Sequence, residues 1–324
     1  MTASRSAHAW LRILFLLAFL PGAAFAQGSA PVTQARPALW KVENAGARVY
    51  LFGSLHILPD TIAWTTPEID AAMAGSDVFV FEVPIDEQAV ATEKDFVVHY
   101  GLLSGPSNLR NVLTRREYLI YSTVLLRAGL KPEQFVRYRP WLASVILGLA
   151  YLHPDNIAQL SGADDLLIDY ARNHGKEVRY LETVEEQMTL LTGPSDVAGV
   201  LSLKRLIRTL PQTRAQSQQL LELWSAGDAE RLGKQVDSYF TGYTMSEDSL
   251  IGNRNRDWVT RIKEMLSESG KTSMVTVGAA HIGGEHGLIA LLCSEGYEVD
   301  RVSMSGAPGM NACNAANPGS ESNR

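Results

Sequence analysis

Short apolar runs that end at glycine or at a charged residue predict the strands of a sheet. The run at residues 78–81 contains no polar residue, which is typical of a strand covered on both faces. Helices are predicted between the runs, because caps such as Thr66 before Pro67 and Thr183 before Glu186 mark helix starts. The predicted strands lie at residues 39–42, 48–52, 77–83, 177–181, 274–277 and 297–302.

The order of these elements predicts an α/β fold with a central mixed sheet, built from two related strand–loop–helix halves. A largely helical insertion at about residues 86–160 separates the halves, and residues 195–267 are also mostly helical and amphipathic. The apolar stretch at residues 141–151 is shorter than the roughly 20 residues that a membrane span needs. We therefore expect it to form a buried helix.

The two ends of the chain differ in composition from the middle. Residues 1–26 have a basic start, an apolar core and a final Ala-Phe-Ala, which predicts a signal peptide cut after Ala26. We expect residues 27–36 to form a flexible leader, residues 37–304 a single α/β domain, and residues 305–324 a disordered tail. The mature protein is then periplasmic or secreted, with no membrane span.

Charge and cysteine content narrow the function further. The net charge of −6 and the absence of a basic block give little support to nucleic-acid binding. Cys293 and Cys313 would pair in an oxidising compartment and hold the tail against the last helix. Two free thiols, or a catalytic thiol, are the alternatives.

Four of the predicted strands end in a residue that can bind a metal or move a proton. Because ligands of open α/β sheets bind beyond the carboxyl ends of the strands, we expect these side chains to meet in one crevice. Imidazole and carboxylate together suit zinc, manganese, iron, cobalt or nickel, and such a site activates a bound water. The four residues are His56, Glu82, Glu182 and His281.

Two of the four share the phrase Gly-x-x-His, which begins at Gly53 and again at Gly278. Each glycine lets the backbone turn sharply and lets a ligand approach closely, because it has no Cβ. Because the phrase occurs twice, it favours metal binding at both histidines more strongly than either histidine would alone. A histidine at a strand end is otherwise most often solvated or merely hydrogen-bonded.

The remaining candidates each allow two interpretations. Glu182 is either part of the site or a carboxylate that favours a helix start. The glycine pair that begins at Gly283 either presents backbone N–H groups to a substrate or forms a flexible turn. Arg254 and Asn255 either reach into the crevice to bind a substrate or lie at the surface.

As a set, these phrases resemble the TraB/GumN family, which is related to the Tiki proteases. The likeness covers nearly the whole mature chain in the family's order, and Ser54 stands where many relatives have threonine. The matching elements are Gly53 to His56, Glu82, Gly162 with Asp164, Leu181 to Thr183 with Glu186 and Gln187, Arg254 and Asn255 with Trp258, and Gly278 to His281 with Gly283.

The resemblance implies an α/β fold with two related halves and a metal-dependent, peptidase-like site. His56 and His281 would be ligands of a divalent ion such as Mn, Co, Fe or Zn. Glu82 would be a ligand or the general base, and Arg254 a supporting, substrate-orienting residue. The expected substrate-binding residues are Gly53, Glu182, Asn255, Gly278 and Gly283.

We therefore expect an exported metal-dependent hydrolase that cleaves a peptide or related amide bond, with Glu82 taking a proton from the activated water. The chain shows no Gly-x-Ser-x-Gly, His-Glu-x-x-His or phosphate-loop motif. One alternative is a periplasmic protein that binds a metal, haem or a peptide without cleaving it. Another is an accessory protein for envelope polysaccharide.

Overall fold

The structure is a computed structural model that describes residues 33–155, 161–192, 196–240, 248–303 and 311–313. The predicted signal peptide and most of the predicted leader and tail therefore lie outside the described residues. No helix among the described residues is long and apolar enough to cross a membrane.

A six-stranded mixed sheet forms the centre of the α/β part, as predicted. Its strand order is β6-β5-β7-β3-β2-β8. The first four strands run parallel to one another, and β2 pairs antiparallel with both β3 and β8. The strands are β2 (Leu39–Asn44), β3 (Ala47–Ser54), β5 (Val78–Phe81), β6 (Glu177–Tyr180), β7 (Thr272–Gly278) and β8 (Val299–Arg301).

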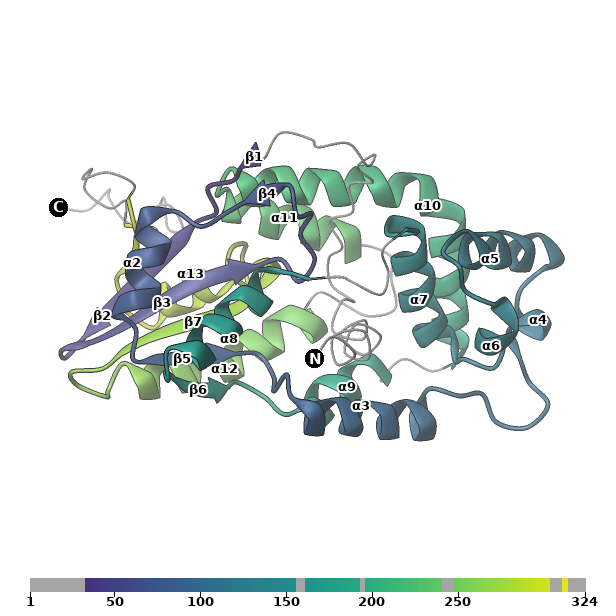
Figure 1. Cartoon of the computed structure of the whole chain (residues 1–324), viewed down its shortest axis with the longest axis horizontal. Coiled ribbons are helices and arrows are strands. Elements are labelled where there is room, and N and C mark those ends of the chain that lie inside the picture. Colours follow the sequence, from purple (N-terminus) through teal and green to yellow (C-terminus); the bar gives the residue numbers. More distant parts are fainter. Residues whose placement is uncertain (1–32, 156–160, 193–195, 241–247, 304–310, 314–324) are drawn as a thin grey trace.

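Helices cover both faces of this sheet (Figure 1). Side chains alternate along the central strands, so Phe79 packs into one hydrophobic core and Val80 into the other. The core that contains Phe79 is closed by α2 (Pro67–Gly75), α8 (Ala163–Asn173), α11 (Ala229–Phe240) and the second half of α10 (Asp196–Ser225). The opposite core is closed by α12 (Asn253–Met265), which follows the π-helix η3 (Asp248–Gly252), and by α13 (Leu288–Ser294).

A separate hydrophobic core holds the helical part of the chain together. Its centre is α7, which is buried along almost its whole length, as expected for the apolar stretch at residues 141–151. The first half of α10 packs against α7 and α5. The helices of this part and its flank are α3 (Glu87–Tyr100), α4 (Leu109–Val112), α5 (Arg115–Arg127), α6 (Pro132–Phe135), α7 (Pro140–Leu152) and α9 (Val184–Thr192).

The long helix α10 belongs to both parts. Leu203 and Leu210 lie in the core of the helical part, whereas Leu220 and Trp224 lie in the α/β core. Pro211 stands between them, where its missing N–H and its ring disturb the helix, and α10 bends along its length in Figure 1. The last turns of α10 thus pack against the sheet near the end of β3.

Both ends of the described chain are held to the rest of the molecule, one by strand pairing and the other by a disulfide. Thr33 and Gln34, in the predicted leader, form the strand β1 (Thr33–Gln34), which pairs with β4 (Ile62–Ala63). Cys293 and Cys313 form a disulfide, which was the preferred prediction from the sequence. This bond holds the described part of the tail against α13.

Candidate functional site

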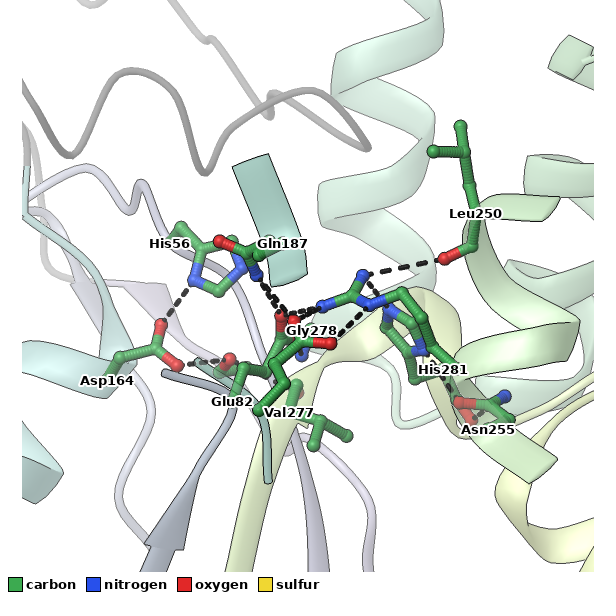
Figure 2. A network of polar contacts seen from close by, with 12 residues as sticks. His56, Glu82, Asp164, Gln187, Leu250, Asn255, Val277, Gly278 and His281 are labelled. Carbon is green, nitrogen blue, oxygen red and sulfur yellow. Dashed lines mark hydrogen bonds and ion pairs between the residues drawn. The ribbon is translucent and has the colours of Figure 1, made fainter. Parts of the chain in front are cut away.

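The carboxyl ends of the four parallel strands bring the predicted strand-end residues together. Because β6, β5, β7 and β3 are consecutive neighbours, their ends present Glu182, Glu82, His281 and His56 along one edge of the sheet. His281 closes a single 3-10 turn, η4 (Ala279–His281), directly after β7. Figure 2 shows the two imidazoles on either side of Glu82.

His56 is oriented by Asp164, which lies in the first turn of α8. Nδ1 of His56 is 2.8 Å from Oδ2 of Asp164, and the hydroxyl of Ser54 donates to Oδ1 of the same carboxylate at 2.7 Å. An ionised carboxylate only accepts, so Nδ1 of His56 carries a proton. Burial opposes a charge on this imidazole, but Asp164 outweighs it and raises the pKa of His56 to about 9.

Gly162 makes this pairing geometrically possible. A Cβ at Gly162 would lie 2.3 Å from the carbonyl oxygen of Leu55 and 2.4 Å from the carbonyl carbon of His56. Only a residue without a side chain lets α8 begin so close to the end of β3. The close approach delivers Asp164 to His56.

His281 is oriented by Asn255 of α12. Both N–H bonds of the Asn255 amide are used, since Nδ2 donates to the carbonyl oxygens of His281 (3.1 Å) and His286 (2.7 Å). Oδ1 of Asn255 therefore accepts from Nδ1 of His281 at 2.7 Å, which leaves a lone pair on Nε2. Burial, together with the nearby Arg254, lowers the pKa of His281 to about 3, so this imidazole is neutral.

Glu82 is held by a backbone donor and by a buried arginine. Its Oε1 accepts from the N–H of Gly278 at 2.6 Å, and its Oε2 accepts from Nη2 of Arg254 at 2.7 Å and from Gln187 at 3.1 Å. Burial alone would raise the pKa of Glu82, but the attraction of Arg254 and the two imidazoles lowers it to about 2. Glu82 is therefore a carboxylate at neutral pH.

Arg254 uses each of its nitrogens on neighbouring side chains. Nε and Nη2 donate to Glu182, Nη2 also donates to Glu82, and Nη1 donates to Nε2 of His281 at 3.1 Å. The guanidinium lies over the ring of Trp258, with Cζ 4.5 Å from the ring centroid. Burial raises the pKa of Glu182 despite this arginine. One cation thus serves two buried carboxylates and an imidazole.

The donor set suits a divalent metal in its chemistry. Ligating histidines usually donate their other ring N–H to a carboxylate or carbonyl oxygen, as His56 and His281 do here. A Cβ at Gly278 would lie 3.3 Å from Oε1 of Glu82, 3.4 Å from Nε2 of His56 and 3.8 Å from Cδ2 of His281. Oε1 of Glu82 and Nε2 of His56 therefore face the position of Gly278, whereas His281 presents a ring carbon to it.

Arg254 forms hydrogen bonds with part of this donor set. Within the described residues, no three His, Cys, Asp or Glu side chains are grouped so as to hold a metal ion. Arg254 donates to the Nε2 lone pair of His281 and to Glu82, which are two of the three expected ligands. His281 can act as a ligand only where Nη1 of Arg254 gives up that hydrogen bond.

The expected substrate-binding residues divide into two groups. Glu182, Asn255 and Gly278 lie in the polar network described above. Gly53 and Gly283 lie in tight packing contacts: a Cβ would come 2.9 Å from the Ile282 side chain at Gly53 and 2.2 Å from the Ala229 carbonyl oxygen at Gly283. Packing alone explains these two glycines, and their role toward a substrate stays a prediction.

Three members of the network had no role predicted from the sequence. They are Ser54, Asp164 and Gln187. Asp164 and Gln187 stand among the elements that resemble the family, but no role followed for them from the sequence. His56, the partner of Asp164, is 108 positions away, and no local pattern links the two.

The chain belongs to the TraB/PrgY/gumN family, whose family model matches residues 38–301. It is also 23% identical to the Danio rerio protein described as metalloprotease TIKI1, over 90% of this chain and 68% of that protein. No solved structure matches the chain at a significant level.

Replacing Asn255 with alanine is expected to lower the free energy of unfolding by about 1–3 kcal/mol, because Nδ1 of His281 and the carbonyl groups of His281 and His286 lose their partner. Urea unfolding followed by circular dichroism measures this loss. The matched control is Asn253→Ala at the exposed first residue of α12, which we expect to stay within about 0.5 kcal/mol. Equal effects at both positions would contradict a specific role for Asn255.

Proposed function

We propose that this protein is an exported, metal-dependent hydrolase that cleaves a peptide or related amide bond. His56, His281 and Glu82 would hold the ion, which is Mn, Co, Fe or Zn. The likeness to a protein described as a metalloprotease supports the peptidase class. The disulfide between Cys293 and Cys313 supports an oxidising compartment, such as the periplasm or the exterior of the cell.

One observation carries the proposal. Two imidazoles from distant parts of the sequence each have Nδ1 bound by a partner, and they lie on either side of Glu82 and close to Gly278. Two histidines with a purely structural role would not both need a partner that fixes the same ring nitrogen. The arrangement leaves Nε2 as the nitrogen of each ring that can bind an ion, once His56 loses its proton and Nη1 of Arg254 gives up its hydrogen bond to His281.

The chain's own residues have separable tasks in this reaction. A bound divalent ion supplies a water of lowered pKa and polarises the scissile carbonyl. Glu82 is ionised and accepts the proton of the attacking water, while the N–H of Gly278 fixes the direction of its carboxylate. Arg254 holds Glu82 and Glu182 side by side. Asp164 and Asn255 each bind Nδ1 of one imidazole, so that Nε2 is the nitrogen left for the ion.

The direct test is the metal content of protein purified without a histidine tag. Mass spectrometry of elements is expected to find about one divalent ion per chain after incubation with Mn²⁺, Co²⁺, Fe²⁺ or Zn²⁺ and gel filtration. We expect His56→Ala and His281→Ala to lose the ion, because each removes one of the two nitrogen ligands. The imidazole of His56, whose pKa is about 9, gives up a proton when it binds the ion.

The matched control is His99→Ala, since His99 is exposed on α3 and its Nδ1 lies beside the carbonyl oxygen of Asp95, four residues before it. This variant is expected to bind metal like the parent. Retention of the ion by both site variants, or its equal loss from the control, would refute the metal site. A Soret absorbance band lost in His56→Ala would instead support a haem-binding protein.

A further inference from the structure

Basic residues are concentrated in one part of this acidic protein. The helices α4 to α7 and the first half of α10, residues 109–152 and 196–214, form one packed unit around a shared core. We call this the basic helical unit. It holds 11 of the chain's 29 lysines and arginines but only 3 of its 35 aspartates and glutamates. The chain as a whole has a net charge of −6, so the rest of the molecule is strongly acidic.

The outer face of α5 combines basic residues with exposed leucines. Leu119 and Leu126 are seven residues apart, so they lie on the same side of the helix, and they are 64% and 62% exposed. Arg115, Arg116 and Arg127 are exposed beside them. None of these arginines forms an ion pair within the described part of the chain. The opposite side of α5 is buried in the core of the basic helical unit through Tyr121, Val124 and Leu125.

The only carboxylate of α5 points away from this face. Glu117 is committed to the capping box, where it accepts from the backbone and hydroxyl of Thr114, and it lies 3.8 Å from Lys204 of α10. No acidic side chain of α5 therefore neutralises the three arginines. In Figure 1, α5 lies at the end of the molecule away from the sheet and its site.

We propose that the outer face of α5 docks on an anionic lipid bilayer, with Leu119 and Leu126 entering the headgroup region and the arginines binding phosphates. An interfacial helix has this composition, because apolar side chains gain by leaving water while arginine pairs with anionic headgroups. A soluble polyanion would need the arginines but not the two leucines. The pairing of both features favours a lipid surface as the occupant.

The first experiment labels Leu119→Cys with an environment-sensitive dye such as NBD. Because both native cysteines form the disulfide, the introduced thiol is the one free thiol of the chain. Vesicles of phosphatidylcholine with phosphatidylglycerol are expected to shift the dye emission to the blue, and pure phosphatidylcholine vesicles are not. The matched control is Val98→Cys, which is 63% exposed on α3, a helix with three acidic residues. It is expected to show no shift.

The second experiment reverses charge on the labelled protein. Arg115→Glu, Arg116→Glu and Arg127→Glu together are expected to weaken binding to the anionic vesicles about 100-fold, since each basic residue near such a surface contributes about 1 kcal/mol. The control reverses three basic residues of the α/β part, with the same change in net charge, and is expected to bind nearly like the parent. These are Arg231, Lys234 and Lys263.

Three results would overturn the proposal. The first is an unshifted dye at position 119 on anionic vesicles, even where the protein sediments with them. The second is equal weakening of vesicle binding by the two triple reversals, which would show that binding depends on net charge alone. The third is binding to a soluble polyanion such as heparin without any dye shift on vesicles, which would assign this face to a polymer in solution.

Discussion

Replacing Glu82 with glutamine is expected to lower peptide hydrolysis by about 10²- to 10⁴-fold, while His56, His281 and the new amide oxygen still hold the metal. The amide oxygen can still accept from the N–H of Gly278, so the local geometry is retained. The amide cannot take a proton from the attacking water, whereas the carboxylate is ionised at neutral pH and can accept one. The readout is kcat/KM on a pool of quenched fluorescent peptides, measured beside the metal content of each sample.

The matched control for this result is Glu185→Gln, the same chemical change at an exposed position in the first turn of α9. It is expected to turn over peptides like the parent. Unchanged hydrolysis in Glu82→Gln would exclude Glu82 as the general base. Loss of metal and activity together would assign Glu82 to the ligand set alone.

Replacing Arg254 with methionine is expected to destabilise the fold by about 3–5 kcal/mol at neutral pH, because the buried carboxylates of Glu82 and Glu182 lose the cation between them. Urea unfolding gives the loss directly. The matched control is Arg179→Met, whose guanidinium pairs with two carboxylates at the surface and should cost no more than about 1 kcal/mol.

The pH dependence of the Arg254 variant checks the cause. In the parent, the pKa of Glu82 is lowered to about 2 from 4.5, so its contribution to stability is present above pH 4.5 and is lost as the pH falls toward 2. In the variant, burial is no longer opposed by Arg254, and the carboxylates gain stability by taking up protons. The difference between variant and parent is therefore expected to shrink as the pH falls from neutral toward 4.5. A loss that is independent of pH would point to packing against Trp258 instead.

The architecture and the strand-end residues could be predicted because they follow from local patterns. An unbroken apolar run predicts a strand buried on both faces, and β5 is such a strand. Parallel strands of one sheet end at the same edge, so residues that close them must be near one another. The α/β fold with its mixed sheet is confirmed on these grounds.

The partners within the site could not be predicted, because they depend on contacts between distant segments. The pairing of His56 with Asp164 requires α8 to begin against the end of β3, and the bonds of Arg254 require α12 to lie across the ends of β5 and β6. The sequence also did not show that α10 belongs to two cores. Such contacts are set by the packing of whole elements, and no short motif encodes them.

The contact of Gly162 with the backbone at His56 has a consequence for sequence variation at positions that carry no functional group. Gly162 carries no functional group, yet even a methyl group there would overlap backbone atoms and displace α8 from the end of β3. In a library that samples every substitution, this glycine should be as intolerant as a residue that performs chemistry. The cause would be crowding rather than reactivity.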